Sequence, residues 1–274
     1  MTRYGMLIDL KSCIGCRACM TACKCNNEIP VGNYEGREYY RIWPKEEELG
    51  RYPYVVRNFT PLLCMHCAAP PCLEACPISG ALHKREDGII LVNVEKCNGC
   101  KQCIQACPYG AIYFRGDKCV VDKCNFCFER VDSGLQPECI KTCVSNAMFF
   151  GDIDDPESKV SKLIKKLDAR PLHPEYGTKP SVYYTTHAGR MSGTVLDLVS
   201  QVPVQGVNIT LEDSETGELL TTITDANGVF FFWRLKIPSI YNLEVEAEGY
   251  LSQRIQKNLV EEYVELEEIQ MRAL

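Results

Sequence analysis

The sequence lacks any long apolar run and any export signal. The longest uninterrupted apolar stretches in its 274 residues, such as residues 229–233, have the length of a strand, whereas a membrane helix needs about 18 apolar residues. We therefore expect no direct insertion into a membrane. The first ten residues contain neither the apolar segment of a signal peptide nor a twin arginine. A thiol-rich chain without such a signal predicts a reducing compartment, and we expect a cytoplasmic protein.

An excess of positive charge is also missing. The chain has 30 Lys and Arg against 36 Asp and Glu, a net charge of −6. From residue 190 onward there are 6 basic against 14 acidic residues, and the first 189 residues hold 24 against 22. No basic patch or stripe is present, which argues against a nucleic-acid partner. Apolar residues make up 46% and charged residues 24% of the chain, a balance that excludes disorder.

Cysteine is abundant, but only in one part of the chain. All eighteen cysteines lie between Cys13 and Cys143, and the last 131 residues have none. Two domains of different chemistry are therefore expected. Sixteen of the cysteines form four motifs, of which the first and third have the spacing C-x2-C-x2-C-x3-C. The motifs are Cys13, Cys16, Cys19 and Cys23; Cys64, Cys67, Cys72 and Cys76; Cys97, Cys100, Cys103 and Cys107; and Cys124, Cys127, Cys139 and Cys143.

This spacing is typical of [4Fe–4S] clusters. Three thiolates on one tight loop can reach three irons of a cubane, while the fourth cysteine of the motif binds the other cluster of a two-cluster unit. The second and third motifs are near neighbours, with a predicted Asp-Gly hairpin over residues 84–93 between them, so the first must pair with the fourth. The four predicted sites are Cys13/Cys16/Cys19/Cys143, Cys124/Cys127/Cys139/Cys23, Cys64/Cys67/Cys72/Cys107 and Cys97/Cys100/Cys103/Cys76. If one site were empty, three clusters would remain.

Other interpretations of the cysteines compete with this one. Structural zinc also uses C-x2-C pairs, but it usually has two pairs 12–20 residues apart. A disulfide framework is the second alternative. Cys25 and Cys119 are left over and are interpreted as inert buried cysteines. His66 lies between two ligands, and we expect it beside a cluster sulfur rather than on iron.

The cysteine motifs resemble those of a known family. Residues 13–23, 63–72, 96–111 and 137–143, with the closing segments 151–156 and 177–184, are similar to the iron–sulfur subunits of the dimethyl-sulfoxide-reductase family of molybdenum and tungsten enzymes. The resemblance implies a non-catalytic electron-transfer subunit in a heterodimer. Its large partner would carry molybdenum on two pterin guanine dinucleotides and all catalytic residues, and the Cys13 cluster would lie nearest to it. A redox subunit of another soluble molybdenum oxidoreductase and a free polyferredoxin are the alternatives.

A short segment separates the two domains. Asp155 as the N-cap and Pro156 at the first helical position predict the start of a helix. Its apolar stripe consists of Val160, Leu163, Ile164 and Leu167, and its lysines Lys159, Lys162, Lys165 and Lys166 are expected in solvent. Prolines 171, 174 and 180 then predict an extended connector that runs along a surface.

The C-terminal part has the alternation of antiparallel strands. Apolar residues alternate with polar ones over residues 207–211 and 241–247, and turn signals separate about seven short strands. Residues 192–197, 203–207, 224–228 and 249–250 resemble carboxypeptidase-regulatory-like domains, which have a prealbumin-like fold. We expect residues 230–232 and Trp233 in its core.

The predicted fold class is therefore α+β, with a duplicated bacterial-ferredoxin-like cluster-binding domain followed by an all-β prealbumin-like sandwich or barrel. The expected four-cluster domain covers residues 1–152, as halves 1–58 and 109–152 with 59–108 inserted. A helix and connector follow over residues 153–189, and the β domain covers residues 190–274.

Overall fold

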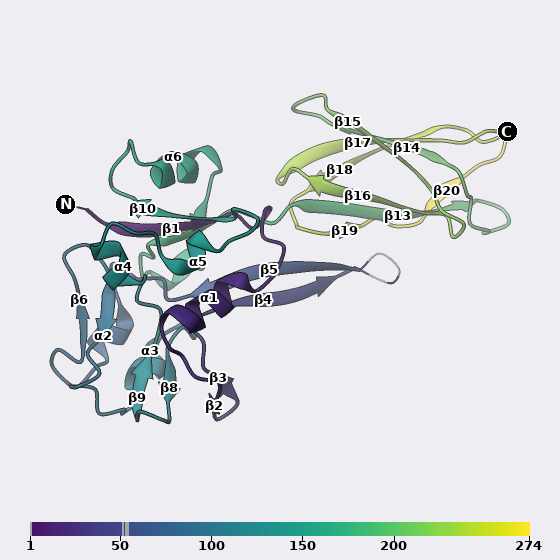
Figure 1. The fold of residues 1–274 in the computed structure, drawn as a ribbon. Helices are drawn as coiled ribbons and strands as arrows, with labels where there is room; N and C mark the ends of the chain where they lie inside the picture. The colour runs from purple at the N-terminus through teal and green to yellow at the C-terminus, as the bar shows by residue number, and fades with distance from the viewer. Residues whose placement is uncertain (1, 51, 53–54) are drawn as a thin grey trace. The chain divides into compact units, whose positions relative to one another are not determined.

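Two units make up the chain in a computed structural model that describes residues 2–50, 52 and 55–274 (Figure 1). The first, here called the cysteine unit, contains Met1–Glu47 and Asn58–Thr185. The second, called the β unit, contains Glu48–Arg57 and Thr186–Leu274. Within the described residues, no helix is both long and apolar enough to cross a membrane.

A four-stranded sheet joins the ends of the cysteine unit. Strand β1 (Tyr4–Ile8) pairs antiparallel with β10 (Met148–Asp152) and parallel with β12 (Val182–Tyr184), and β12 pairs with β11 (Arg170–Pro171). Figure 1 shows β1 and β10 side by side. Met6, Leu7 and Ile8 are all fully buried. Because successive residues of a strand point to opposite faces, both faces of this sheet are covered.

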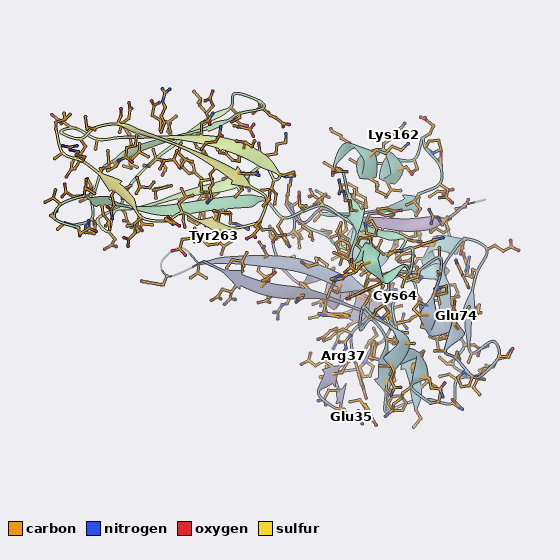
Figure 2. All side chains as sticks on the ribbon, turned by 180° about the vertical axis from the view of Figure 1, so that it is seen from behind. Glu35, Arg37, Cys64, Glu74, Lys162 and Tyr263 are labelled. Atoms are coloured by element: carbon orange, nitrogen blue, oxygen red, sulfur yellow. The ribbon has the colours of Figure 1, made fainter. Side chains whose placement is uncertain are left out.

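One helix covers this sheet, and it starts later than predicted. Helix α6 spans Lys159–Lys166, with Ser158 as the N-cap, whose hydroxyl accepts from the Ser161 N–H at 3.1 Å. Asp155 instead accepts from the Glu157 N–H and closes a turn before the helix, so the predicted cap at Asp155 is wrong. The four lysines are exposed as expected, and Figure 2 shows Lys162 on the outer side of α6.

The expected surface connector is instead part of the sheet. Val182 and Tyr184 of β12 are buried in the main core of the cysteine unit, and the Tyr184 hydroxyl donates to the Pro61 carbonyl at 2.9 Å. Pro171 lies in a strand, as predicted for an extended backbone, but strand pairing with β1 draws the end of this segment inside. A short 3-10 helix, η1 (Pro174–Tyr176), lies between β11 and β12.

Short helices and two-stranded sheets form the rest of the cysteine unit, and one of these strand pairs extends into residues 48–57, which belong to the β unit. The described helices are α1 (Ala18–Asn26), α2 (Pro71–Glu74), α3 (Gln102–Ala106), α4 (Phe128–Asp132) and α5 (Glu138–Lys141). The strand pairs are β2 (Asn33–Tyr34) with β3 (Arg37–Glu38), β4 (Ile42–Leu49) with β5 (Val56–Leu63), β6 (Leu82–Lys84) with β7 (Ile90–Val92), and β8 (Tyr113–Arg115) with β9 (Val120–Asp122). The β6–β7 pair confirms the predicted hairpin, and Gly88 has the positive φ of 87° that its turn requires.

Two layers of strands form the β unit, which confirms the predicted all-β fold class. One contains β16 (Val229–Leu235), β13 (Gly189–Asp197), β19 (Val264–Glu265) and β20 (Ile269–Met271); the other contains β15 (Leu219–Ile223), β14 (Asn208–Asp213), β17 (Ser239–Glu246) and β18 (Gln253–Leu259). Val207, Ile209, Leu211, Leu243 and Val245 are fully buried between them. The pairing is not antiparallel throughout, because β13 pairs parallel with β19 and β20. The β unit has more described strands than the seven predicted, because β19 and β20 are short additional strands.

Trp233 is not in the core. Its side chain is 54% exposed, while Phe230 and Phe232 are buried among the core residues of the β unit. The run of aromatic residues hides an ordinary strand alternation. It places Trp233 on the opposite face of β16, where its ring lies 4.1 Å from that of Phe231.

Candidate metal centres

The first group of thiols lies where the N-terminal loop enters α1. Cys13, Cys16 and Cys19 come from this loop and helix, and Cys143 follows α5. Burial and the neighbouring Cys13 thiol raise the pKa of Cys19 to about 12, and the Cys16 and Cys143 thiols act in the same direction. The structure thus brings together Cys143 and the first three cysteines, across more than 120 positions of the chain.

The second group is the most deeply buried. Cys124 and Cys139 are enclosed, and burial together with the surrounding thiols holds their pKa values well above the usual range. Cys23 from α1 and Cys127 are the other members of this group. Polar hydrogens point at the sulfurs here: the Phe126 N–H donates to Cys124 Sγ at 3.4 Å, and the amide of Asn27 donates to Cys23 Sγ at 3.6 Å.

The third group lines a small cavity. Cys64, Cys67, Cys72 and Cys107 surround it together with Ile90 and Tyr109, and Figure 2 marks Cys64 within the cysteine unit. Burial raises the pKa of Cys67 to about 11 and, with the Cys64 thiol, that of Cys72 to about 12. Cys107 belongs to the third motif of the sequence, so this group draws its thiols from two motifs.

The fourth group surrounds a second cavity. Its thiols are those of Cys76, Cys97, Cys100 and Cys103, and burial followed by the Cys76 thiol raises the pKa of Cys103 to about 11. Lys101 has a left-handed backbone with φ of 63° immediately before α3. Arg17 has the same conformation before α1, with φ of 61°.

This repeated left-handed residue explains how the motif folds. In both triple-cysteine loops it follows the second cysteine and reverses the chain, so that the third cysteine enters the helix beside the first two. Such a conformation is uncommon for residues other than glycine. The loop geometry is therefore a shared feature of the first and third motifs.

Cys25 and Cys119 lie outside the four groups. Both are exposed, so the prediction that they are buried is wrong. Cys25 is on α1, and Cys119 Sγ lies 3.6 Å from the Gly116 carbonyl. Neither thiol is among the neighbouring thiols that raise the pKa values of the grouped cysteines.

His66 is buried beside the third group. Its Nδ1 accepts from the Ile90 N–H at 3.0 Å, and its ring stacks on Phe126 with the centroids 3.7 Å apart. Burial, followed by the Lys123 charge, lowers the pKa of His66 well below its usual value. Among the described residues, no three His, Cys, Asp or Glu side chains are gathered closely enough to hold a single metal ion.

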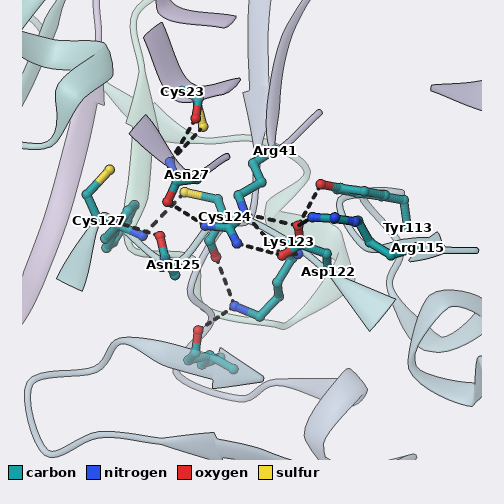
Figure 3. Close-up of polar contacts among 12 residues, drawn as sticks. Cys23, Asn27, Arg41, Tyr113, Arg115, Asp122, Lys123, Cys124, Asn125 and Cys127 are labelled. Atoms are coloured by element: carbon teal, nitrogen blue, oxygen red, sulfur yellow. Dashed lines mark hydrogen bonds and ion pairs between the residues drawn. The ribbon is translucent and has the colours of Figure 1, made fainter. Parts of the chain in front are cut away.

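Sequence reasoning missed a polar network beside the second group (Figure 3). Arg41 Nε donates to Asp122 Oδ1 at 3.0 Å, and Arg41 Nη1 donates to Asn27 Oδ1 at 2.7 Å. Asp122 also accepts from the Tyr113 hydroxyl at 2.7 Å. Arg41 and Asp122, the central pair of this network, are 81 positions apart in the sequence, so no spacing could have shown it. Only for the adjacent Lys123 did the sequence contain a hint of a role near the thiols, because this lysine directly precedes Cys124.

The donor set fits iron–sulfur clusters. All eighteen thiols, which lie within the described residues, are unpaired, so the structure contradicts a disulfide framework. The buried thiols of these groups, such as Cys19, Cys72 and Cys139, have raised pKa values, because burial and repulsion from neighbouring thiolates both disfavour ionisation. Ligation needs the thiolate form, and bound iron supplies the positive charge that stabilises it. Such groups are therefore chemically suited to hold a cationic iron–sulfur core.

Comparisons with known proteins agree with this chemistry. Residues 55–153 match the family model "4Fe-4S dicluster domain", and residues 4–24 match "4Fe-4S binding domain". Residues 190–271 match "Carboxypeptidase regulatory-like domain".

Several curated proteins are similar over most of their length. The iron–sulfur subunit of a putative dimethyl sulfoxide reductase of Halobacterium salinarum is 38% identical over 70% of this chain and 81% of the relative. A tetrathionate reductase subunit of Salmonella typhimurium is 40% identical over 66% of this chain and 72% of its own length. The iron–sulfur subunit of the arsenate respiratory reductase of a Shewanella species is 37% identical over 68% of this chain and 97% of its own length.

Proposed function

The chain belongs to the electron-transferring iron–sulfur subunits of the dimethyl-sulfoxide-reductase family of molybdenum enzymes, and from that premise we propose that it carries four [4Fe–4S] clusters for a large catalytic subunit. The observation that supports this most directly is the exchange of the fourth cysteine between motifs. Cys107 lies with the second motif and Cys76 with the third, the arrangement that cross-ligation in a two-cluster ferredoxin requires.

The proposed ligand sets follow the four groups. They are Cys13, Cys16, Cys19 and Cys143 for the first; Cys23, Cys124, Cys127 and Cys139 for the second; Cys64, Cys67, Cys72 and Cys107 for the third; and Cys76, Cys97, Cys100 and Cys103 for the fourth. The first and second groups are close in space, as are the second and third. This proximity is indicated by the electrostatic effect of Cys19 on the pKa of Cys139 and of Cys64 on that of Cys124. An electron path from the first group through the second to the third is consistent with this proximity.

The clusters, when bound, accept and donate single electrons. The residues of the chain hold them in place, bury them and supply hydrogen-bond donors to their sulfurs. The Phe126 N–H at Cys124 and the Ala147 N–H at Cys143, at 3.4 and 3.3 Å, stabilise negative charge on these ligands. Because a reduced cluster carries more negative charge, such donors favour the reduced form.

Anaerobic purification from the native source tests this function. We expect about sixteen iron and sixteen sulfide atoms per chain, as four [4Fe–4S] clusters require, and co-elution with a much larger subunit that carries molybdenum on two pterin guanine dinucleotides. Elution of an iron-loaded chain alone, near its own mass of 31.0 kDa, would instead identify a free polyferredoxin. Zinc without iron or sulfide would contradict the proposal.

For the substrate, we propose that the complex is a pyrogallol–phloroglucinol transhydroxylase. The support is domain organisation: the small subunit of that enzyme resembles this chain in having a β domain after its clusters. The reaction moves a hydroxyl group between polyhydroxybenzenes without net redox change, so the clusters would maintain the oxidation state of molybdenum. The expected result is that the purified complex transfers a hydroxyl group to pyrogallol from a second polyhydroxybenzene, which loses that hydroxyl and gains a hydrogen in its place. Reduction of an inorganic oxyanion instead would identify a different molybdenum oxidoreductase.

A further inference from the structure

Lys123 is a buried cation between two of the thiol groups. It lies directly after β9 and before Cys124, and it is only 2% exposed. Its Nζ donates to the Cys124 carbonyl at 3.0 Å and to the Ile90 carbonyl (Figure 3). Cys124 belongs to the second group, and Ile90 lines the cavity of the third. The ammonium is therefore anchored to both groups through neutral carbonyls.

No carboxylate balances this ammonium within the described part of the chain. Asp122, its neighbour in sequence, pairs with Arg41 at 2.9 Å and accepts from Tyr113. Arg115, the third cation of this region, pairs with Asp117 at 2.5 Å. An isolated ammonium is costly to bury, so its balancing charge must come from another source.

The second and third groups of thiols supply the negative charge that balances the Lys123 ammonium once they hold clusters. The Lys123 charge acts on Cys72 and Cys107 of the third group, where it opposes the rise in pKa that burial causes. A [4Fe–4S] core with four thiolates has a net negative charge in either oxidation state, because four ligand charges exceed the charge of the core. A buried cation beside two such anions interacts strongly with both, since the protein interior screens charge weakly.

We propose that Lys123 is a counter-cation shared by the clusters of the second and third groups and that it raises the reduction potentials of both. The proposal rests on the proposed function, because it requires those clusters. Each reduction adds one negative charge beside the ammonium, so the cation stabilises the reduced form more than the oxidised form. Lys123 thus stabilises an added electron on each of the two clusters through which electrons pass from one ferredoxin-like unit to the other.

Replacement of Lys123 in the full chain tests this proposal. Lys123→Gln removes the charge and keeps a hydrogen-bond donor, and Lys123→Met removes both. Lys96→Met is the matched control, because Lys96 also directly precedes a ligand, Cys97, but is exposed to water. Each protein is purified anaerobically, its iron and sulfide are counted, and its clusters are titrated with reductant while their electron paramagnetic resonance signals are recorded. Cys64→Ser and Cys124→Ser variants assign the signals of the third and second clusters.

We expect both Lys123 variants to lower the midpoint potentials of the second and third clusters. A tenfold shift of each one-electron equilibrium corresponds to about 59 mV. The other two clusters, and all four in Lys96→Met, should not shift by a comparable amount. Unchanged potentials in fully loaded Lys123 variants would overturn the proposal and leave the cluster assignment intact. A wild-type chain without sixteen iron atoms would instead count against the proposed function.

Lys123→Arg decides the matter if the neutral variants fail to assemble clusters. Assembly with potentials near those of the wild type would support the proposal, because arginine keeps the charge while changing the shape. Failure of the arginine variant as well would overturn it, since shape rather than charge would then be what the site needs.

Discussion

At the scale of single residues, the sixteen grouped cysteines differ from the other two by their surroundings. The grouped thiols lie in four clusters of sulfur atoms, whereas Cys25 and Cys119 are exposed and apart from them. The chemical state of the side chain does not distinguish the two kinds of cysteine, since all eighteen are unpaired thiols. What distinguishes the grouped cysteines is that each lies near three other thiols.

Serine substitutions separate the two kinds of cysteine. We expect Cys139→Ser, at a fully buried member of the second group, to lower the iron content by up to four atoms per chain, because a hydroxyl is a much weaker ligand for iron. Cys25→Ser and Cys119→Ser should retain full iron content and serve as controls. Iron and sulfide analysis of anaerobic protein measures this. Loss of a cluster from either control would show that the ligand sets are wrong.

His187 makes stability depend on pH. Burial, followed by the Arg190 charge, lowers the pKa of His187 to about 4. Because its pKa is lower in the folded chain than in the unfolded chain, the stability it contributes is complete above pH 6.5 and is lost as pH falls towards 4. We expect a loss of about 1 kcal/mol between pH 7 and pH 5.5.

Urea unfolding of the full chain at these two pH values measures the effect. His187→Gln should lose less stability on acidification than the wild type. His83→Gln, at an exposed histidine, should behave like the wild type. Equal pH dependence in all three proteins would exclude His187 as the cause.

The sequence was informative about ligands and uninformative about the charges around them. Cysteine spacing is a local property, because three ligands come from one loop, so the motifs could be recognised directly. Arg41 and Asp122 are 81 positions apart, and their meeting depends on how the inserted unit folds back. The burial of Lys123 has the same origin, since the carbonyl of Ile90 is 33 positions away.

At the scale of elements, tight loops position the thiols. Gly99 lies within the third motif with φ of 70°, and a Cβ there would come within 2.4 Å of the Cys119 carbonyl oxygen and 2.9 Å of the Phe114 ring. The first contact is with backbone, which cannot rotate away. This glycine is therefore required both for its left-handed conformation and for the approach of the β8–β9 turn.

Alanine substitutions test this requirement. Gly99→Ala should prevent the fourth group from closing and lower the iron content by up to four atoms per chain. Gly110→Ala is the matched control, because Gly110 also has a positive φ, 59°, but a Cβ there meets nothing within 4 Å. It should cost only about 1–2 kcal/mol of strain and keep full iron content. Full iron content in Gly99→Ala would contradict the argument.

Helices and strands near the end of the cysteine unit show where local rules fail. Both Asp155 and Ser158 are good N-caps, and Asp155 followed by proline was the stronger local signal. Ser158 caps α6 because its hydroxyl also donates to the Asp152 carbonyl at 2.6 Å, a contact that only the tertiary fold provides. Likewise, residues 182–184 form strand β12 because they pair with β1, which lies near the N-terminus.

At the scale of the whole molecule, the cysteine unit and the β unit depend on different forces. The β unit has a continuous apolar core between two layers. The cysteine unit instead contains four groups of thiols, two of which line cavities, and the helices around them are short. Cluster binding should therefore supply much of its folding free energy.

Removal of the clusters should unfold one unit and spare the other. We expect chelator or oxygen to abolish hydrogen-exchange protection over residues 1–150, while the amides of β13 to β18 remain protected. Hydrogen exchange with mass spectrometry of the full chain before and after treatment measures this. Retained protection in the cysteine-bearing residues after complete iron loss would contradict the prediction.

The place of β1 between β10 and β12 has a consequence for synthesis on the ribosome. Ile8 precedes its partner Met148 by 140 positions, a wait of about 7–30 s at ordinary rates of translation. The third and fourth proposed ligand sets are complete once Cys107 has emerged, whereas the first needs Cys143 and the second Cys139. The two sets in the inserted residues can therefore be completed first, and the other two close only after the late strands have returned to an N-terminal segment that was synthesised long before them.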